Sequence, residues 1–340
     1  MSEDASRLRM HLSRHRQNLR RHLQFASEFL VKCQILDPYV EKGVLRGAVC
    51  PWEIGVKEPA GYAILEDFHD TLEAIWVWSY YTLVSKQPTY IPNIKAGWDY
   101  ITKNFDRFIP PDRENEGFYD CAQFLSAVTQ YEAAFSDRAY RRWVEIAGNR
   151  LAQYIPNLRP ARGREYSDPW WMTACLAAAA NTLRNEDWWK TAKRFVQRTI
   201  LKKKKPFTLI EKEPRHRGPG GHDFFSQNAT KVLALLACAP WNGLVQFVLD
   251  NFLPVTPSQF VQRHADENAW NASVAMALGE SYLATQNHTF LEHYFAIMDE
   301  LKQRDWQQAA ALPRAELFPV RESWVTHFYA RAYAAIVKKP

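Results

Sequence analysis

Six clusters of acidic and aromatic residues are the parts of this sequence best suited to chemistry. Each cluster stands just before an apolar run of helical length, and the first acids of successive clusters are 43 to 56 residues apart. Nearly equal steps indicate a degenerate internal repeat. The repeat brings carboxylates, imidazoles and indoles to the starts of six helices. The clusters are Glu66–Asp70, Glu116–Asp120, Asp168–Trp171, His222–Phe225, Asp266–Trp270 and Glu322–Trp324.

The first cluster holds three carboxylates and one histidine within five residues. Glu66 and Asp70 are four positions apart and Asp67 and Asp70 are three apart, so at least two acids share a helix face. Repulsion between neighbouring carboxylates separates their pKa values. Such a pair can act as general acid and general base on a glycosidic or uronide bond. Asp67, Asp70 and His69 are therefore candidate catalytic residues.

The fourth cluster also contains candidate catalytic residues, His222 and Asp223. They follow Gly218–Gly221, a glycine-rich segment that lets backbone and substrate approach closely. A histidine at the first turn of a helix is well placed to act as a base. For any single cluster, helix capping is the simpler explanation, because an acid at a helix start satisfies unpaired N–H groups and complements the helix dipole.

Candidate substrate-binding residues come from the remaining clusters and from one long connection. Of the two adjacent tryptophans after Asp168, one is expected to face a cavity, and we choose Trp170. Core packing is the simpler explanation for several of the others, including Trp270 and His327. Aromatic walls with a few polar groups are typical of small-molecule sites. The full set is Trp52, Tyr119, Asp168, Trp170, Glu267, Trp270, Trp324 and His327.

Two alternating kinds of helix must position these residues. One kind is apolar nearly all round, which is typical of a helix buried between neighbours, and the other is charged on one face, which is typical of a helix at the surface. Inner helices are expected at about 66–85, 116–135, 168–183, 223–238, 267–285 and 322–338, and outer helices at about 5–35, 92–107, 137–155, 186–202, 241–252 and 288–304.

Six helices of each kind predict an all-α fold, a single domain over residues 1–340 arranged as a closed (α/α)6 toroid. The first outer helix, 5–35, would meet the last inner helix, 322–338, across the closure. Links from outer to inner helices are long, and long connections in a compact domain are usually functional. In a toroid these links share one face with the starts of the inner helices, so we expect the largest cavity at that mouth.

Bulk composition narrows the choice of partners and compartment. The chain has 47% apolar and 24% charged residues, as a globular protein does, and a net charge of +6. We find no nucleic-acid-binding motif or basic stripe, so the expected partner is a small molecule, which the charge allows to be anionic. Five cysteines without metal-ligand spacing, no apolar signal region and no run long enough to span a membrane favour a cytoplasmic protein.

The alternation of helices and the six clusters resemble the six-hairpin glycosidase-like superfamily of glycoside hydrolases, uronyl hydrolases, lyases and sugar epimerases. His222–Asp223–Phe224 is similar to a His–Asp pair at an inner-helix start of the cytoplasmic unsaturated uronyl hydrolases. Asp168–Pro169–Trp170–Trp171 resembles the acid–Trp–Trp openings of several sugar-cleaving members. The resemblance implies a carbohydrate-active enzyme that uses carboxylate acid/base chemistry and needs no metal or other cofactor.

Two other functions stay open at this point. Glu66–Asp67 followed by Asp70 resembles the magnesium–diphosphate motif of class I terpene synthases and prenyl synthases, which implies Mg²⁺ held by these three acids. A second metal motif at the required spacing is not found, and neither is the Asp–x–Asp–Asp motif of class II cyclases. A non-catalytic helical scaffold is the third interpretation, and it predicts acids spread over the outer surfaces instead of gathered at one mouth.

Overall fold

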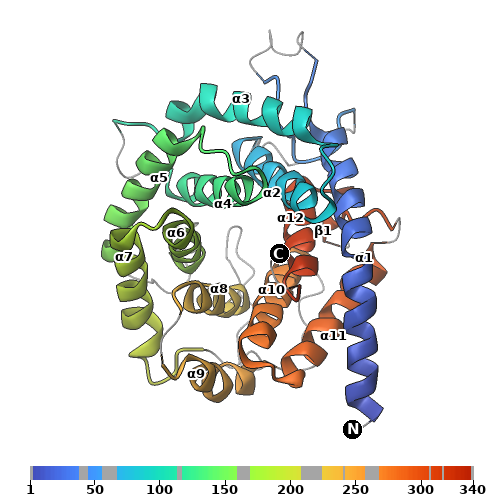
Figure 1. Ribbon diagram of the computed structural model, residues 1–340, viewed down its shortest axis with the longest axis vertical. Coiled ribbons are helices and arrows are strands. Elements are labelled where there is room, and N and C mark those ends of the chain that lie inside the picture. Colours follow the sequence, from blue (N-terminus) through green and yellow to red (C-terminus); the bar gives the residue numbers. More distant parts are fainter. Residues whose placement is uncertain are drawn as a thin grey trace.

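The computed structural model describes residues 3–37, 45–55, 67–112, 117–158, 169–207, 224–239, 242–256, 268–305, 308–315 and 318–337. Within these residues twelve α-helices form two concentric rings (Figure 1). The inner ring contains α2 (Asp67–Ser85), α4 (Phe118–Phe135), α6 (Pro169–Leu183), α8 (Phe224–Ala237), α10 (Asn268–Thr285) and α12 (Ser323–Ala334). The outer ring contains α1 (Glu3–Cys33), α3 (Ile91–Phe108), α5 (Arg141–Tyr154), α7 (Glu186–Val196), α9 (Leu244–Asn251) and α11 (His288–Arg304).

The short links that lead from inner to outer helices share one backbone feature. A non-glycine residue with a φ of 55° to 59° follows α2, α4, α6 and α10, in the left-handed conformation that commonly ends a helix. Asparagine side chains then begin two of the next helices: Asn185 accepts from the Trp188 N–H at 3.1 Å, and Asn287 accepts from the Thr289 N–H at 2.9 Å. Each of these four inner helices is thereby reversed tightly into its outer partner.

The ring closes where the two ends of the chain meet. Helix α12 packs against both α10 and α2, and α1 packs along α2 and α12. The phenol ring of Tyr333 is stacked between His15, at 3.8 Å between centroids, and His22, at 4.0 Å. The His15 Nε2 atom also lies 2.7 Å from the Tyr333 carbonyl oxygen. These contacts confirm the expected (α/α)6 toroid, and the helices begin within four residues of their expected positions.

Two local features depart from the expected pattern of helices and loops. A π-helical turn, Gln197–Leu201, continues α7, and an antiparallel hairpin of β1 (Pro313–Ala315) and β2 (Phe318–Arg321) precedes α12. Ala311 and Leu312 beside the hairpin are buried, and buried backbone groups need hydrogen-bond partners. Pairing supplies some of them, since the Glu322 N–H donates to the Leu312 carbonyl at 3.0 Å.

Candidate active site inside the ring

The starts of α2 and α4 bring a histidine and a carboxylate together. The Nε2 atom of His69 lies 2.5 Å from Oδ1 of Asp120, and both side chains keep partial exposure, 20% and 16%. The ring of Tyr119 meets the imidazole edge-on at 4.9 Å between centroids. A carboxylate beside an imidazole orients the ring and stabilises its protonated form. The pair can therefore take a proton from a bound molecule and return it.

A second polar group lies one helical turn farther along the same helices. The Gln123 amide donates through Nε2 to Oε1 of Glu73 at 2.8 Å and to the Tyr119 hydroxyl at 3.0 Å. The Nδ1 atom of His327 on α12 lies 3.5 Å from the same Glu73 oxygen. Glu73, Gln123 and His327 are all at most 3% exposed. A buried charge without partners is costly. Glu73 therefore depends on its contacts with Gln123 and His327, and we call these three residues one electrostatic unit.

A buried arginine completes the charge of this unit. Arg331, one turn after His327 on α12, lies with its guanidinium carbon 4.3 Å from the ring centroid of Trp76 and 5.2 Å from that of Trp171, and it donates to the Ser126 hydroxyl. Burial lowers the pKa of Arg331 to about 10, so the guanidinium stays charged at neutral pH. Burial, followed by the Arg331 charge, lowers the pKa of His327 well below its ordinary value, so that imidazole is neutral.

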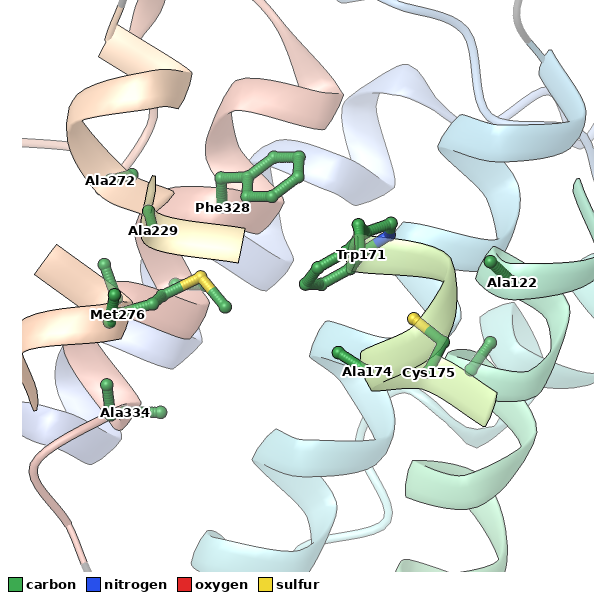
Figure 2. Packing of buried hydrophobic residues seen from close by; sticks show 14 of the residues in the cluster. Ala122, Trp171, Ala174, Cys175, Ala229, Ala272, Met276, Phe328 and Ala334 are labelled. Atoms are coloured by element: carbon green, nitrogen blue, oxygen red, sulfur yellow. The ribbon is translucent and has the colours of Figure 1, made fainter. Parts of the chain in front are cut away.

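Aromatic rings from three inner helices adjoin these polar groups. Trp171 and Phe328 extend from α6 and α12 toward one another, with 5.8 Å between their centroids (Figure 2). Trp324 lies 6.3 Å from Phe328 and 6.1 Å from Trp270 of α10. Trp270 and Trp324 are partly exposed, whereas Trp171 is buried. Rings of this kind offer a flat apolar surface to a ligand beside the titratable groups.

Part of the predicted site lies on the described inner helices. His69, Tyr119 and His327 belong to the polar network, and Trp270 and Trp324 belong to the aromatic group. Glu66, Asp168, His222, Asp223 and Glu267, together with the side chain of Asp67, lie outside the described residues. Their assignment as catalytic or binding residues stays a prediction, as does the cavity at the mouth.

Two other candidates interact with different parts of the chain. Asp70 is 2% exposed, and its charge is near enough to Cys33 of α1 to add to the effect of burial in raising the pKa of that thiol. The Trp170 indole donates to the Thr199 hydroxyl at 3.3 Å. Trp171, its neighbour, is the tryptophan that points toward Phe328.

Trp52 belongs to segment 45–55, which touches the start of α12. The adjacent Pro51 carbonyl accepts from the Ser323 N–H at 2.7 Å. Trp52 itself is partly buried. Its expected place at the rim and its role in binding stay predictions.

Sequence reasoning passed over the residues one turn inside the helix starts. Glu73, Gln123 and Arg331 each stand four positions after a candidate residue, respectively His69, Tyr119 and His327. Residues four apart share a helix face, so this spacing could have identified them. Asp120, Trp76 and Trp171 were also missed, although Asp120 belongs to the second acidic cluster.

The described residues give no support to a metal centre or a membrane span. Among them no three His, Cys, Asp or Glu side chains are grouped so as to hold a metal ion, and none of their helices combines the length and apolar character needed to cross a membrane. The side chains of Glu66 and Asp67 are not among them. The magnesium interpretation of that cluster therefore stays open.

Comparison with known proteins supports the fold. No family model and no curated protein matches the chain. A solved D-mannose isomerase matches with a TM-score of 0.67 and 13% identity, covering 95% of this chain and 98% of its own. A heparin-specific unsaturated glucuronyl hydrolase matches with a TM-score of 0.65 and 12% identity, covering 94% of this chain and 97% of its own. The unsaturated glucuronyl hydrolase of Bacillus sp. GL1 matches with a TM-score of 0.59 and 12% identity, covering 93% of this chain and 95% of its own. At this identity the likeness shows the shared six-hairpin toroid fold.

Proposed function

We propose that this protein is an enzyme that acts on a sugar by proton transfer inside the ring of inner helices. The observation that carries the proposal is the 2.5 Å contact between His69 Nε2 and Asp120 Oδ1, on two different inner helices. An ion pair with a purely structural role could lie equally well on the outer surface of the protein. This one lies instead beside a buried carboxylate, a neutral imidazole and a buried guanidinium, which together suit acid/base catalysis.

The favoured reaction is the interconversion of an aldose and a ketose. His69, held by Asp120, would remove a proton from the carbon next to the carbonyl and return it to the former carbonyl carbon, while a proton passes from the hydroxyl of the first carbon to the former carbonyl oxygen. Arg331 would stabilise the negative charge that develops on oxygen in between, because a fixed cation in a dry site is effective there. Trp324 and Trp270 would pack on the sugar. The similarity in fold to a protein named D-mannose isomerase supports this class.

Hydrolysis of an unsaturated uronide is the second candidate. The buried positive charge of Arg331 and the net charge of +6 favour an anionic substrate, and two structures of similar fold carry the name unsaturated glucuronyl hydrolase. In this reaction the predicted acids Asp67, Asp70 and Asp223, with His222, would be the acid/base candidates. They remain candidates on the sequence pattern alone.

The test is an activity screen with matched variants. The protein is incubated with reducing sugars, whose isomers are separated by chromatography, with unsaturated uronides, whose conjugated double bond is followed by ultraviolet absorbance, and with prenyl diphosphate plus Mg²⁺. We expect sugar isomerisation that is lost in Asp120→Asn and kept in the control Asp137→Asn, a surface acid that caps the Ala139 N–H. Turnover of the diphosphate alone, or full sugar activity in Asp120→Asn, would overturn the proposal.

A further inference from the structure

Two cysteines face each other where α1 ends. Cys33 is the last residue of α1, and the residue after it, Gln34, forms an antiparallel bridge with Val49. That register places Cys33 directly opposite Cys50. The Cys50 N–H donates to the Cys33 carbonyl at 2.9 Å, so one backbone hydrogen bond joins the two residues. Directly opposite residues on an antiparallel pair project their side chains from the same face.

The spacing of such a pair suits a disulfide. Opposite residues of an antiparallel pair have Cα atoms about 4.5 to 5.5 Å apart, inside the range of about 4.4 to 6.8 Å that a disulfide spans. Both thiols are reduced here. Burial raises the pKa of the Cys33 thiol well above its ordinary value, and nearby negative charge, including that of Cys50, raises it further. The influence of Cys50 on this pKa, smaller than those of Asp70 and Glu53, agrees with this proximity.

We propose that Cys33 and Cys50 are a reversible redox pair that a small-molecule disulfide oxidises. Cys50 is partly exposed and Cys33 is fully buried, so the Cys50 thiolate attacks first. It displaces one thiolate from the small disulfide and forms a mixed disulfide. The Cys33 sulfur then attacks the Cys50 sulfur and displaces the second thiolate, which takes up the Cys33 proton as it leaves. Two protein thiols and one disulfide become one protein disulfide and two small thiols.

The disulfide would link α1 covalently to segment 45–55, which contacts α2 and the residues just before α12. The Val49 N–H donates to the Thr71 hydroxyl of α2 at 2.8 Å, and Glu53 pairs with Arg321, just before α12, at 2.8 Å. Oxidation would restrict the unfolded chain between the two cysteines without moving these contacts. The oxidised protein should therefore unfold at a higher temperature than the reduced one.

The experiment uses the whole folded protein, oxidised glutathione, thiol alkylation and peptide mass spectrometry. We expect a Cys33–Cys50 peptide that lacks two hydrogens, reversal by dithiothreitol, and a rise of a few degrees in Tm. Cys50→Ser should abolish both effects, whereas Cys121→Ser, at a buried cysteine of α4, should keep them. Cys50→Ala serves as a second variant. A glutathione adduct that stays on Cys50, or no mass change in the native protein, would refute the pair.

Discussion

The carboxylate of Glu73 accepts a hydrogen bond from the Gln123 amide at 2.8 Å across the interface between α2 and α4. Both side chains are at most 3% exposed. Burial lowers the pKa of Arg331, and the charges of Cys175 and of the Glu73 carboxylate oppose this lowering. Removing one member of such a unit leaves the others buried without compensation.

We expect Glu73→Ala to destabilise the fold by about 3 to 5 kcal/mol, the usual cost of breaking a buried charge pair. Glu73→Gln should cost less because the amide oxygen can still accept from Gln123. Chemical denaturation of each variant measures the free energy of unfolding. Glu186→Ala is the control, since that side chain is 76% exposed in its pair with Lys190 and should contribute within about 0.5 kcal/mol. Equal losses in Glu73→Ala and Glu186→Ala would contradict the role given to Glu73.

Asp120→Asn tests the proton-transfer pair. The amide keeps the size of the side chain but removes the negative charge beside His69. We expect kcat/KM on the active sugar to fall by about 10² to 10⁴ while Tm stays nearly unchanged. Asp70→Asn is a useful comparison because Asp70 lies toward Cys33. A larger loss in Asp70→Asn than in Asp120→Asn would favour the acid pair predicted from the sequence.

A glycine in the segment that pairs with the end of α1 is required for two reasons. Gly47 has a φ of +96°, and a Cβ atom there would lie 2.0 Å from the Ala96 carbonyl oxygen. We expect Gly47→Ala to destabilise by about 3 kcal/mol or more, from steric overlap added to backbone strain. Gly55 has a φ of +89° with nothing within 4 Å of its Cβ position, so Gly55→Ala should cost only about 1 to 2 kcal/mol. Thermal unfolding compares the two, and equal losses would rule out the overlap.

The fold could be predicted because burial leaves a strong periodic signal. The alanine-rich α6 is apolar on every side, whereas α7 carries its charges on one face, and the two kinds of helix alternate along the chain. The hairpin before α12 left no such signal. Its short strands supply hydrogen-bond partners to buried backbone groups. The need for these partners arises from tertiary packing and leaves no mark on the local residue pattern.

The site could be predicted only in part because sequence does not state which way a helix is turned. Trp170 and Trp171 are adjacent, yet Trp171 meets Phe328 while the Trp170 indole donates to Thr199. Asp70 and His69 are adjacent, yet His69 meets Asp120 while the charge of Asp70 acts on Cys33. One helical position is a rotation of about 100°, which decides whether a side chain enters the ring or a helix interface.

The stack of His15, Tyr333 and His22 makes stability depend on pH. Burial is the main cause that lowers the pKa of His15 to about 4 and of His22 to about 3, with smaller contributions from Arg16 and from His15 respectively. An unfolded histidine binds its proton near pH 6.5, so between that pH and the folded pKa the unfolded state holds more protons. Stability due to these groups is therefore complete above about pH 6.5 and is lost as the pH falls toward 4 and 3.

We expect His22→Phe to remove much of this acid sensitivity. Phenylalanine can keep the stacking on Tyr333, and the His22 Nε2 atom has no hydrogen-bond partner to lose among the described residues. The free energy of unfolding is measured at pH 7 and at pH 4.5 for parent and variant. The parent should lose on the order of 2 kcal/mol more than His22→Phe does. His288→Phe, at an exposed histidine of α11, should behave as the parent. A parent and a His22→Phe protein with the same pH dependence would show that His22 does not hold α1 against α12 in this way.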